Sequence, residues 1–309
     1  MIAKGRSLKF LSDIRVFEVP FFQRPYVWEE EHWQALLDGL LEEEAQFLGS
    51  IIIKWEEAAK GERKAVIIDG QQRITTISIL IKALYDCMEK EKKETIGDAR
   101  NALFYRTSPL SSEYHLSLQH STFDFASYKS VMGEVQRANE SCPYDHISSP
   151  LKETKITIKK ETNRIKRCYR FFYETLSRMY KEEKEKVERL WCAIFGDEKE
   201  VIVLIELERS EDEQKIFDTI NSSGLKLSIS DIVKNAIYQR LMSFNNNKED
   251  AIEFYKKTWE HVFEDDEEKK EYWAVEKKRN SGHLNIQNIE IFLFCFAYKL
   301  ALQNLKELD

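Results

Sequence analysis

Apolar and polar positions follow two different periods along the first part of this chain. Residues 14–19, 47–54 and 65–68 are short alternating or β-branched runs, which are typical of strands. Residues 29–44 instead place large apolar side chains at helical spacing, and from Gln71 onward apolar residues recur every three or four positions. The first part of the chain is therefore predicted to contain both strands and helices.

The pattern turns mainly helical after about residue 150, although VIVLIELE at 201–208 predicts one more strand. Ser210 and Ser228 are each followed by an acidic residue three positions later, which is a signature of a helix start. Upstream, segments 102–106 and 113–118 are predicted to pair as antiparallel strands. The later helices are expected at residues 210–220, 229–243 and, as a buried helix, 289–305.

This order of elements predicts an α+β fold with a small mixed sheet, followed by a mostly helical region. A soft boundary divides the chain into an N-terminal domain at 1–120 and a mainly helical domain at 121–309. Ten glycines and five prolines among 309 residues are too few for a sandwich of many tight turns. Apolar residues make up 42% of the chain, which is enough to build a core.

The formal net charge of 47 − 54 = −7 argues against a protein that coats nucleic acid, but it permits a local basic surface. No window contains 18 uninterrupted apolar residues, and the first residues lack the apolar core of a signal peptide. Five scattered cysteines without a C-x-x-C pair are typical of reduced, packing residues. We therefore expect a cytoplasmic protein without a membrane segment.

The most informative stretch is the one around Asp69, Gly70 and Arg73. A buried strand ends at Asp69, Gly70 permits a sharp turn, and a helix starts at once. A helix N-terminus offers unpaired N–H groups that suit a phosphate, and Arg73 adds a planar cation. Asp69 is a candidate Mg²⁺ ligand, while Gln71 and Gln72 could hold a ribose, a base or an attacking water. The alternative is that Asp69 merely caps the helix and Arg73 pairs with a surface carboxylate. A P-loop motif is absent.

A second polar and aromatic stretch, QRPYVW at 23–28, stands just before the helix at 29–44. Gln23 and Arg24 could reach a phosphate, and Tyr26 or Trp28 could stack on a base. The alternative is a structural loop whose aromatic rings seal the core.

A third stretch, FDTINSSGLKLSISDIVKN at 217–235, predicts a helix, a glycine turn and a capped helix. Asn221 and Lys234 are polar groups near this turn, and Lys234 could neutralise a phosphate at the first stretch. The alternative is an ordinary helix hairpin.

Taken together, QRPYVW, IDGQQRITTISIL at 68–80 and the third stretch resemble the signatures of one family. Their order and spacing are similar to those of the GmrS/GmrD-type restriction endonuclease N-terminal domain, also known as domain of unknown function 262. The resemblance covers roughly residues 8–240.

The resemblance implies a ParB/sulfiredoxin-like nucleotide-binding domain followed by a helical domain. Members bind and often hydrolyse NTPs, and they use this to control cleavage of modified phage DNA. By this analogy Asp69, Gln71, Gln72 and Arg73 form the catalytic site. By the same analogy Gln23 and Arg24 face this site. The further candidate nucleotide-binding residues are Gly70, Thr75, Thr76, Asn221 and Lys234.

A nuclease motif is not found within these residues. His146 opens a stretch that resembles a His-Asn-His motif, but no second histidine follows at short range. DNA cleavage is therefore expected to need a His-Asn-His domain or subunit, and the helical pattern of the last residues favours a chain that continues. Formation of a homo-oligomer is possible, and the sequence does not decide the oligomeric state.

Residues 151–189 carry 13 basic and 7 acidic side chains, a local balance of 13 − 7 = +6. One helical face with Lys159 and Arg167 could follow a DNA backbone by phosphate neutralisation. The alternative is a solvated face that pairs with the excess acid of the chain.

The leading hypothesis is an NTP-dependent sensor and regulatory module of a modification-dependent antiphage restriction system. Arg73 and the amides after Gly70 would hold phosphates, Asp69 would organise Mg²⁺ or the attacking water, and Gln71 or Gln72 would position that water. The rival hypotheses are a binding module that uses nucleotide only as a switch, and a DNA-binding module without nucleotide.

Overall fold

A computed structural model describes residues 1–42, 46–57, 63–88, 97–106, 114–133, 163–196, 199–208, 228–244, 248–278 and 285–306, together with residues 211 and 216. By its contacts the chain forms two compact units. The first unit comprises Met1–Phe21 with Pro25–Glu213, and the second comprises Phe22–Arg24 with Gln214–Asp309. The boundary predicted at residue 120 falls inside the first unit.

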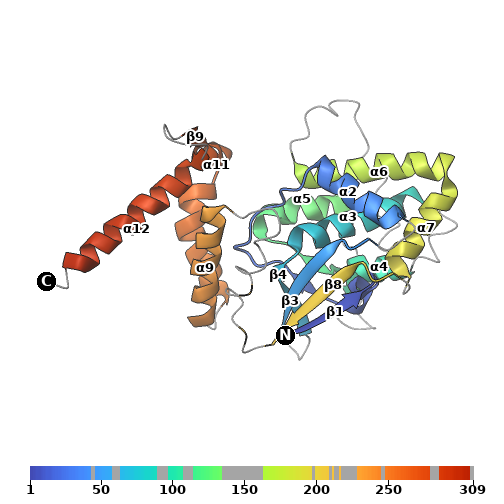
Figure 1. The fold of residues 1–309 in the computed structure, drawn as a ribbon, viewed down its shortest axis with the longest axis horizontal. Coiled ribbons are helices and arrows are strands. Elements are labelled where there is room, and N and C mark those ends of the chain that lie inside the picture. The colour runs from blue at the N-terminus through green and yellow to red at the C-terminus, as the bar shows by residue number, and fades with distance from the viewer. Residues whose placement is uncertain are drawn as a thin grey trace. The chain divides into compact units, whose positions relative to one another are not determined.

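The first unit contains a mixed six-stranded sheet, in agreement with the predicted α+β class (Figure 1). Its order is β1, β8, β3, β4, β2, β7, and the strands are β1 (Ile2–Arg6), β8 (Ile202–Leu207), β3 (Gly49–Glu57), β4 (Arg63–Asp69), β2 (Phe17–Glu18) and β7 (Leu118–Gln119). Strand β8 pairs parallel with β3 and antiparallel with β1. It therefore completes the sheet from a position about 130 residues after β4 in the sequence.

All four predicted strands of this sheet are present, but β2 is limited to two residues. Strand β3 lies in the centre, where Ile51, Ile52 and Ile53 are fully buried. This burial explains why its sequence is a continuous β-branched run rather than an alternating one. The antiparallel pair predicted upstream is confirmed as β5 (Phe104–Arg106) and β6 (Tyr114–Leu116).

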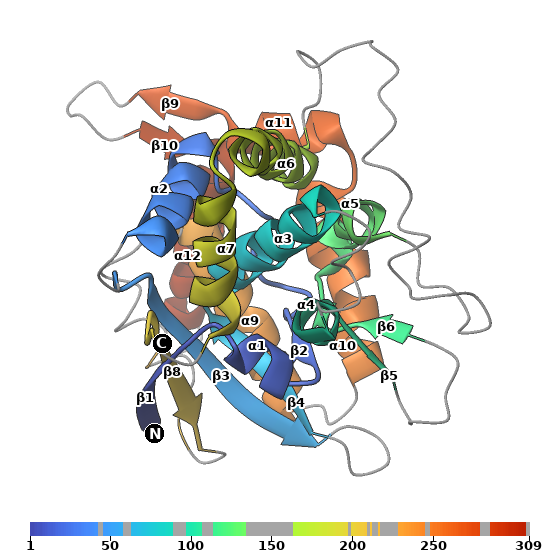
Figure 2. The same cartoon turned by 90° about the vertical axis from the view of Figure 1, so that its right-hand side faces the viewer.

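Helix α3 (Gln71–Cys87) lies between the sheet and helix α6 (Arg164–Glu182) (Figures 1 and 2). It is buried almost all round, including the polar Thr75, Thr76 and Lys82. Buried polar side chains need hydrogen-bond partners inside the protein, so the polar side chains of α3 are expected in internal hydrogen-bond networks. The other helices of this unit are α1 (Phe10–Asp13), α2 (Glu30–Leu41), α4 (Gly97–Leu103), α5 (Thr122–Met132) and α7 (Lys184–Phe195).

The second unit is mainly helical, as predicted. It contains α9 (Ile229–Phe244), α10 (Lys248–Tyr255), the π-helix η4 (Lys256–Glu264), α11 (Glu267–Ala274), the antiparallel strands β9 (Glu276–Lys278) and β10 (Asn285–Gln287), and α12 (Asn288–Lys306). The helix start predicted at Ser228 is confirmed, because its hydroxyl accepts the Asp231 N–H at 3.1 Å and donates to the Asp231 carboxylate at 2.8 Å.

The prediction of a helix near the C-terminus is right, but the prediction that it is buried is wrong. Helix α12 packs at its start, where the Phe292 ring lies 5.7 Å from that of Phe263. Further along, Phe294 is 71% and Tyr298 60% exposed within the described structure. Apolar composition predicts that a helix needs cover but does not say what covers it. No helix in the described ranges is long and apolar enough to cross a membrane.

Candidate functional site

The turn between β4 and α3 has the predicted strand–glycine–helix form. Gly70 adopts φ +93°, and a Cβ added there would lie 3.0 Å from Ile51 Cγ1 and 3.1 Å from Ile51 Cα. Glycine is therefore required both by the left-handed conformation and by the close approach of β3. Asp69 ends β4, and α3 starts with Gln71, so the first N–H groups of a 17-residue helix lie at this turn.

Arg73, in the first turn of α3, is turned back against the start of β3. Its Nη1 donates to the Ser50 carbonyl at 2.8 Å, and a Cβ on Gly49 would lie 2.4 Å from its Nη2. Gly49 has φ +117°, so both the space and the backbone conformation beside the guanidinium depend on this glycine. Sequence reasoning missed Gly49 and Ser50, although a glycine directly before a β-branched run is a readable signal.

The electrostatic setting of Arg73 is that of a cation with incomplete partners. Burial lowers its pKa, while the nearby Asp69 carboxylate raises it, and the guanidinium stays charged. The buried Nε–H of Arg73 has no hydrogen-bond partner among the described residues. A buried donor without an acceptor is costly, which makes the Arg73 guanidinium a candidate anion-binding group.

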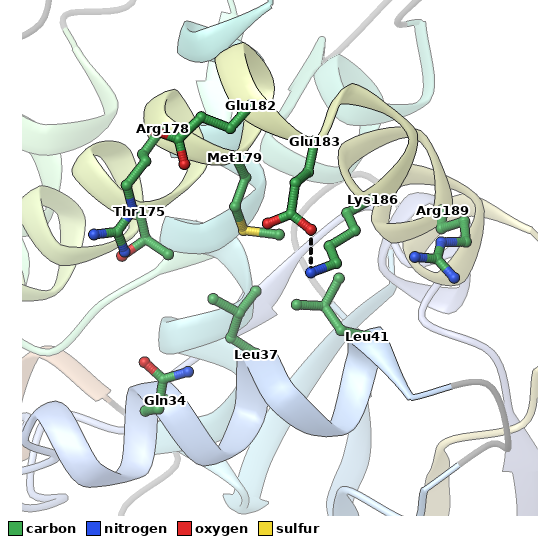
Figure 3. Close-up of a pocket in the computed structure, with 10 residues that line it drawn as sticks. All are labelled: Gln34, Leu37, Leu41, Thr175, Arg178, Met179, Glu182, Glu183, Lys186 and Arg189. Atoms are coloured by element: carbon green, nitrogen blue, oxygen red, sulfur yellow. Dashed lines mark ion pairs between the residues drawn. The ribbon is translucent and has the colours of Figure 1, made fainter.

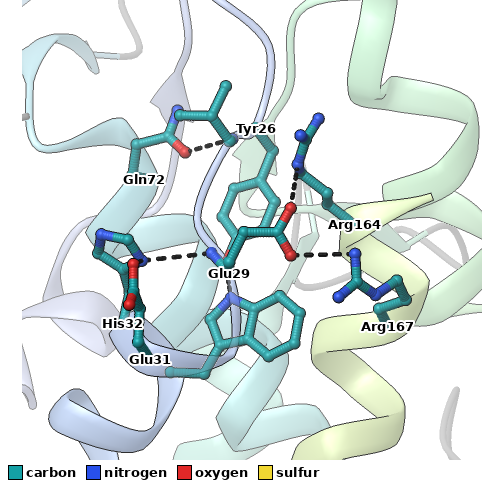
Figure 4. A network of polar contacts seen from close by, with 9 residues as sticks. Tyr26, Glu29, Glu31, His32, Gln72, Arg164 and Arg167 are labelled. Atoms are coloured by element: carbon teal, nitrogen blue, oxygen red, sulfur yellow. Dashed lines mark hydrogen bonds and ion pairs between the residues drawn. The ribbon is translucent and has the colours of Figure 1, made fainter. Parts of the chain in front are cut away.

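Gln72 is used differently from the predicted role of holding a substrate or a water. Its Oε1 accepts the Val27 N–H at 2.8 Å, and its Nε2 donates to the Pro25 carbonyl at 3.1 Å. Figure 4 shows this side chain pointing at the backbone beside Tyr26. The second residue of the QQR segment therefore fastens the QRPYVW loop to α3.

Tyr26 is buried, with 3% of its surface exposed. Its hydroxyl accepts the Trp33 Nε1–H at 2.9 Å and lies 2.6 Å from Thr76 Oγ1. Thr76 Oγ1 also donates to the Gln72 carbonyl at 2.7 Å, and the Tyr26 hydroxyl donates to Cys168 Sγ at 3.5 Å. The predicted role of Tyr26 as a DNA-stacking residue does not fit this burial, because no ring face is open to a base.

A buried row of Thr75, His120 and Asp124 supports the same loop, and sequence reasoning missed its last two members. Thr75 Oγ1 lies 2.8 Å from His120 Nε2, and Asp124 Oδ2 accepts the Tyr26 N–H at 2.7 Å. Burial lowers the pKa of His120 to about 3 and raises that of Asp124 to about 6. Neutral His120 Nδ1 stands 3.8 Å from Asp124 Oδ2, so we count no ion pair there. Thr75, which was predicted to bind the nucleotide, is fully buried.

Lys234, the cation predicted to neutralise a phosphate, lies in the second unit. It is 2% exposed, and its Nζ lies 3.0 Å from Glu264 Oε1. The same carboxylate accepts Trp259 Nε1–H at 3.1 Å and the Tyr255 hydroxyl. Lys234 is thus paired with a carboxylate inside its own unit, and its role as a phosphate ligand stays a prediction.

The family of the chain follows from a comparison with protein-family models. The model described as "GmrSD restriction endonuclease, N-terminal domain" matches residues 8–238, which is most of the chain. The chain belongs to this GmrSD N-terminal domain family. A search of curated proteins finds no match. Membership indicates a component of a restriction system, with DNA and a nuclease domain or partner.

The other predicted residues of this GmrSD domain are placed as follows. Trp28 is half-buried, with its ring 5.9 Å from Arg73 Cζ. Gln23 and Arg24 are grouped with the second unit. Asn221 and Lys159 lie outside the described residues, as does His146.

Arg167, the remaining predicted DNA contact, belongs to a surface ion cluster. Its Nη1 lies 3.0 Å from Glu29 Oε2, and Arg164 Nε lies 2.6 Å from Glu29 Oε1 (Figure 4). This arrangement agrees with the alternative prediction, in which basic side chains of this segment pair with acidic ones on a solvated face.

Within the described ranges, no group of three or more His, Cys, Asp or Glu side chains could hold a metal ion. The GmrSD domain also has a 260 Å³ pocket between α2, α6 and α7 (Figure 3). Its lining combines apolar side chains, such as Leu37 and Met179, with charged ones, such as Arg178 and Lys186. None of the predicted site residues lines it.

Proposed function

We propose that this chain is the NTP-binding and NTP-hydrolysing regulatory module of an antiphage restriction system that acts on modified DNA. The observation that carries the proposal is the buried Nε–H of Arg73 without a described partner, at the N-terminus of α3. A helix N-terminus and a guanidinium fork both favour phosphate oxygens. Family membership adds the restriction context.

In this proposal the phosphate chain lies over the turn after Gly70 and takes its contacts from the first amides of α3 and from Arg73. The charge of the nearby Asp69 carboxylate opposes the lowering of the Arg73 pKa by burial. Gln71, which is buried at the helix start, would help to orient the attacking water. Positioning and charge stabilisation do most of the catalysis in phosphoryl transfer to water.

Mg²⁺ fits this site only as a companion of the nucleotide. Asp69 supplies one carboxylate, and Mg²⁺ commonly takes one or two carboxylates together with phosphates and waters. When bound, the ion would neutralise phosphate charge. The nuclease that cuts the DNA would be a His-Asn-His domain or subunit.

The test is phosphate release from each of the four NTPs with Mg²⁺, with and without DNA carrying modified bases. Arg73→Ala should lower turnover by at least about 10²-fold, because it removes charge stabilisation of the transferred phosphate. Arg189→Ala, which removes an exposed arginine of α7, is the matched control and should leave turnover unchanged. Wild-type turnover in Arg73→Ala and in Asp69→Ala would refute the site.

A second candidate function is a nucleotide-gated switch without hydrolysis. It is favoured by the engagement of Gln72, since both amide atoms of this predicted water-positioning residue bind the loop at Pro25 and Val27. This candidate predicts calorimetric binding of an NTP that depends on Arg73, with the nucleotide intact after hours of incubation.

A further inference from the structure

The loop that contains Pro25, Tyr26 and Val27 is held to the first unit through its backbone. Gln72 accepts from Val27 N and donates to the Pro25 carbonyl, and Asp124 accepts from Tyr26 N. Three consecutive residues are thus fixed by side chains of α3 and α5, which follow them in the chain by 45 or more positions.

The residue that directly follows this fastened stretch is Trp28. Its indole lies with its ring centre 5.9 Å from Arg73 Cζ, within the range of a cation–π contact. On α2, the His32 ring is stacked with the same indole at 5.5 Å and an angle of 18°. Trp28 therefore lies beside the guanidinium that we assign to phosphate binding.

Gln72 and Arg73 are neighbours in the sequence, but their side chains bind different elements of the first unit. Arg73 reaches the start of β3, while Gln72 reaches the loop that carries Trp28. The pair thus connects β3, α3 and the QRPYVW loop within one helical turn. A change at Gln72 would move Trp28 relative to Arg73 without altering any group that faces a phosphate.

We infer that Gln72 is a positioning residue that acts through Trp28, and that the Trp28 indole forms one wall of the Arg73 anion site. This inference rests on the proposed function for its ligand, a polyphosphate. The hydrogen bonds of Gln72 set the loop, the loop sets the indole, and the indole holds Arg73 in the pose that receives the anion.

The experiment uses the full chain, with tripolyphosphate as the probe because it carries the charge of an NTP without its base. Gln72→Met and Trp28→Leu should each weaken tripolyphosphate binding by about tenfold, as expected for one lost cation–π contact in a desolvated site. The double variant should bind no more weakly than either single variant, because both act on one route. Gln34→Met removes an exposed glutamine hydrogen bond and is the matched control.

A second readout does not depend on any ligand. Acrylamide quenching of the Trp28 signal, obtained as the difference between the protein and its Trp28→Phe variant, should increase when Gln72 is replaced by Met. Gln72→Glu keeps the acceptor for Val27 N and loses the donor to Pro25, so it serves if the Met variant does not fold.

The outcomes separate the two proposals. Unchanged quenching in the Gln72 variants overturns the positioning role, and additive losses of about a hundredfold in the double variant overturn the route through Trp28. If quenching increases in the Gln72 variants but the wild-type protein does not bind tripolyphosphate, the positioning role is supported and the proposed polyphosphate ligand is refuted.

Discussion

Arg73 and Lys234 are both cations that the sequence suggested for phosphate binding, and their surroundings differ. Arg73 donates to one carbonyl and keeps a buried Nε–H without a described partner. Lys234 is paired with Glu264, whose carboxylate also accepts from Trp259 and Tyr255. Each cation lies in its own unit.

The difference teaches how to separate a ligand site from a structural cation. A buried charge is stable when its partners are complete, and then it has little left to offer an incoming anion. A buried donor with no acceptor instead carries an unpaid desolvation cost that a ligand would remove. On this criterion Arg73 is the stronger candidate for binding an anion, whereas the ammonium of Lys234 already faces a carboxylate of its own unit.

The largest expected effect comes from breaking the Lys234 pair. Glu264→Ala removes the carboxylate that faces the buried Lys234 ammonium, which should lower the free energy of unfolding of the second unit by about 3–5 kcal/mol. Hydrogen exchange resolved by mass spectrometry would localise the loss to α9 and η4. The double variant Lys234→Met with Glu264→Gln removes both charges, and the glutamine keeps an acceptor for Trp259. It should recover most of the free energy of unfolding that Glu264→Ala loses. Little or no loss in Glu264→Ala would mean that Lys234 is not held as a structural cation.

A pH test sharpens the comparison inside the first unit. The raised pKa of Asp124, about 6 against an ordinary 3.8, makes its contribution to stability fall as pH rises through that window. The lowered pKa of His120, about 3 against 6.5, makes its contribution rise with pH over an overlapping window. The two slopes should largely cancel between pH 4 and 6.

Single substitutions should expose the two slopes. In Asp124→Asn the free energy of unfolding should increase by about 2–3 kcal/mol from pH 4 to 6, since only the His120 slope is left. In His120→Gln it should decrease by a similar amount. Urea unfolding followed by tryptophan fluorescence measures both, and slopes of equal sign in the two variants would contradict the assignment.

The smallest effect on stability is expected at Gly49. Gly49→Ala should cost about 1–3 kcal/mol because the residue has φ +117° and its Cβ would meet the Arg73 guanidinium. Because the guanidinium is displaced, the Gly49→Ala variant should also bind the proposed nucleotide more weakly. In an Arg73→Ala background the added Cβ no longer meets a guanidinium, so Gly49→Ala should cost less stability there. An equal loss in both backgrounds would show that Gly49 matters only for its own backbone.

Local sequence chemistry determined much of the fold. The β-branched run of β3, the glycine turn at Gly70 and the start of α9 at Ser228 were all readable, because each depends on a few neighbouring residues. The position of Arg73 in the first turn of a helix was readable for the same reason. The family signature IDGQQRITTISIL contains this turn.

Tertiary structure alone decided the partners. Arg73 meets Ser50 from 23 positions away, Gln72 meets Val27 from 45, and Lys234 meets Glu264 from 30. No local pattern contains these distances, so the sequence could not distinguish a glutamine that holds a loop from one that holds a water. Likewise, β8 lies between β1 and β3, two strands that are distant from it in the sequence, and no local pattern specifies that place. Helix α12 shows the same limit, since its composition predicts a helix but not its cover.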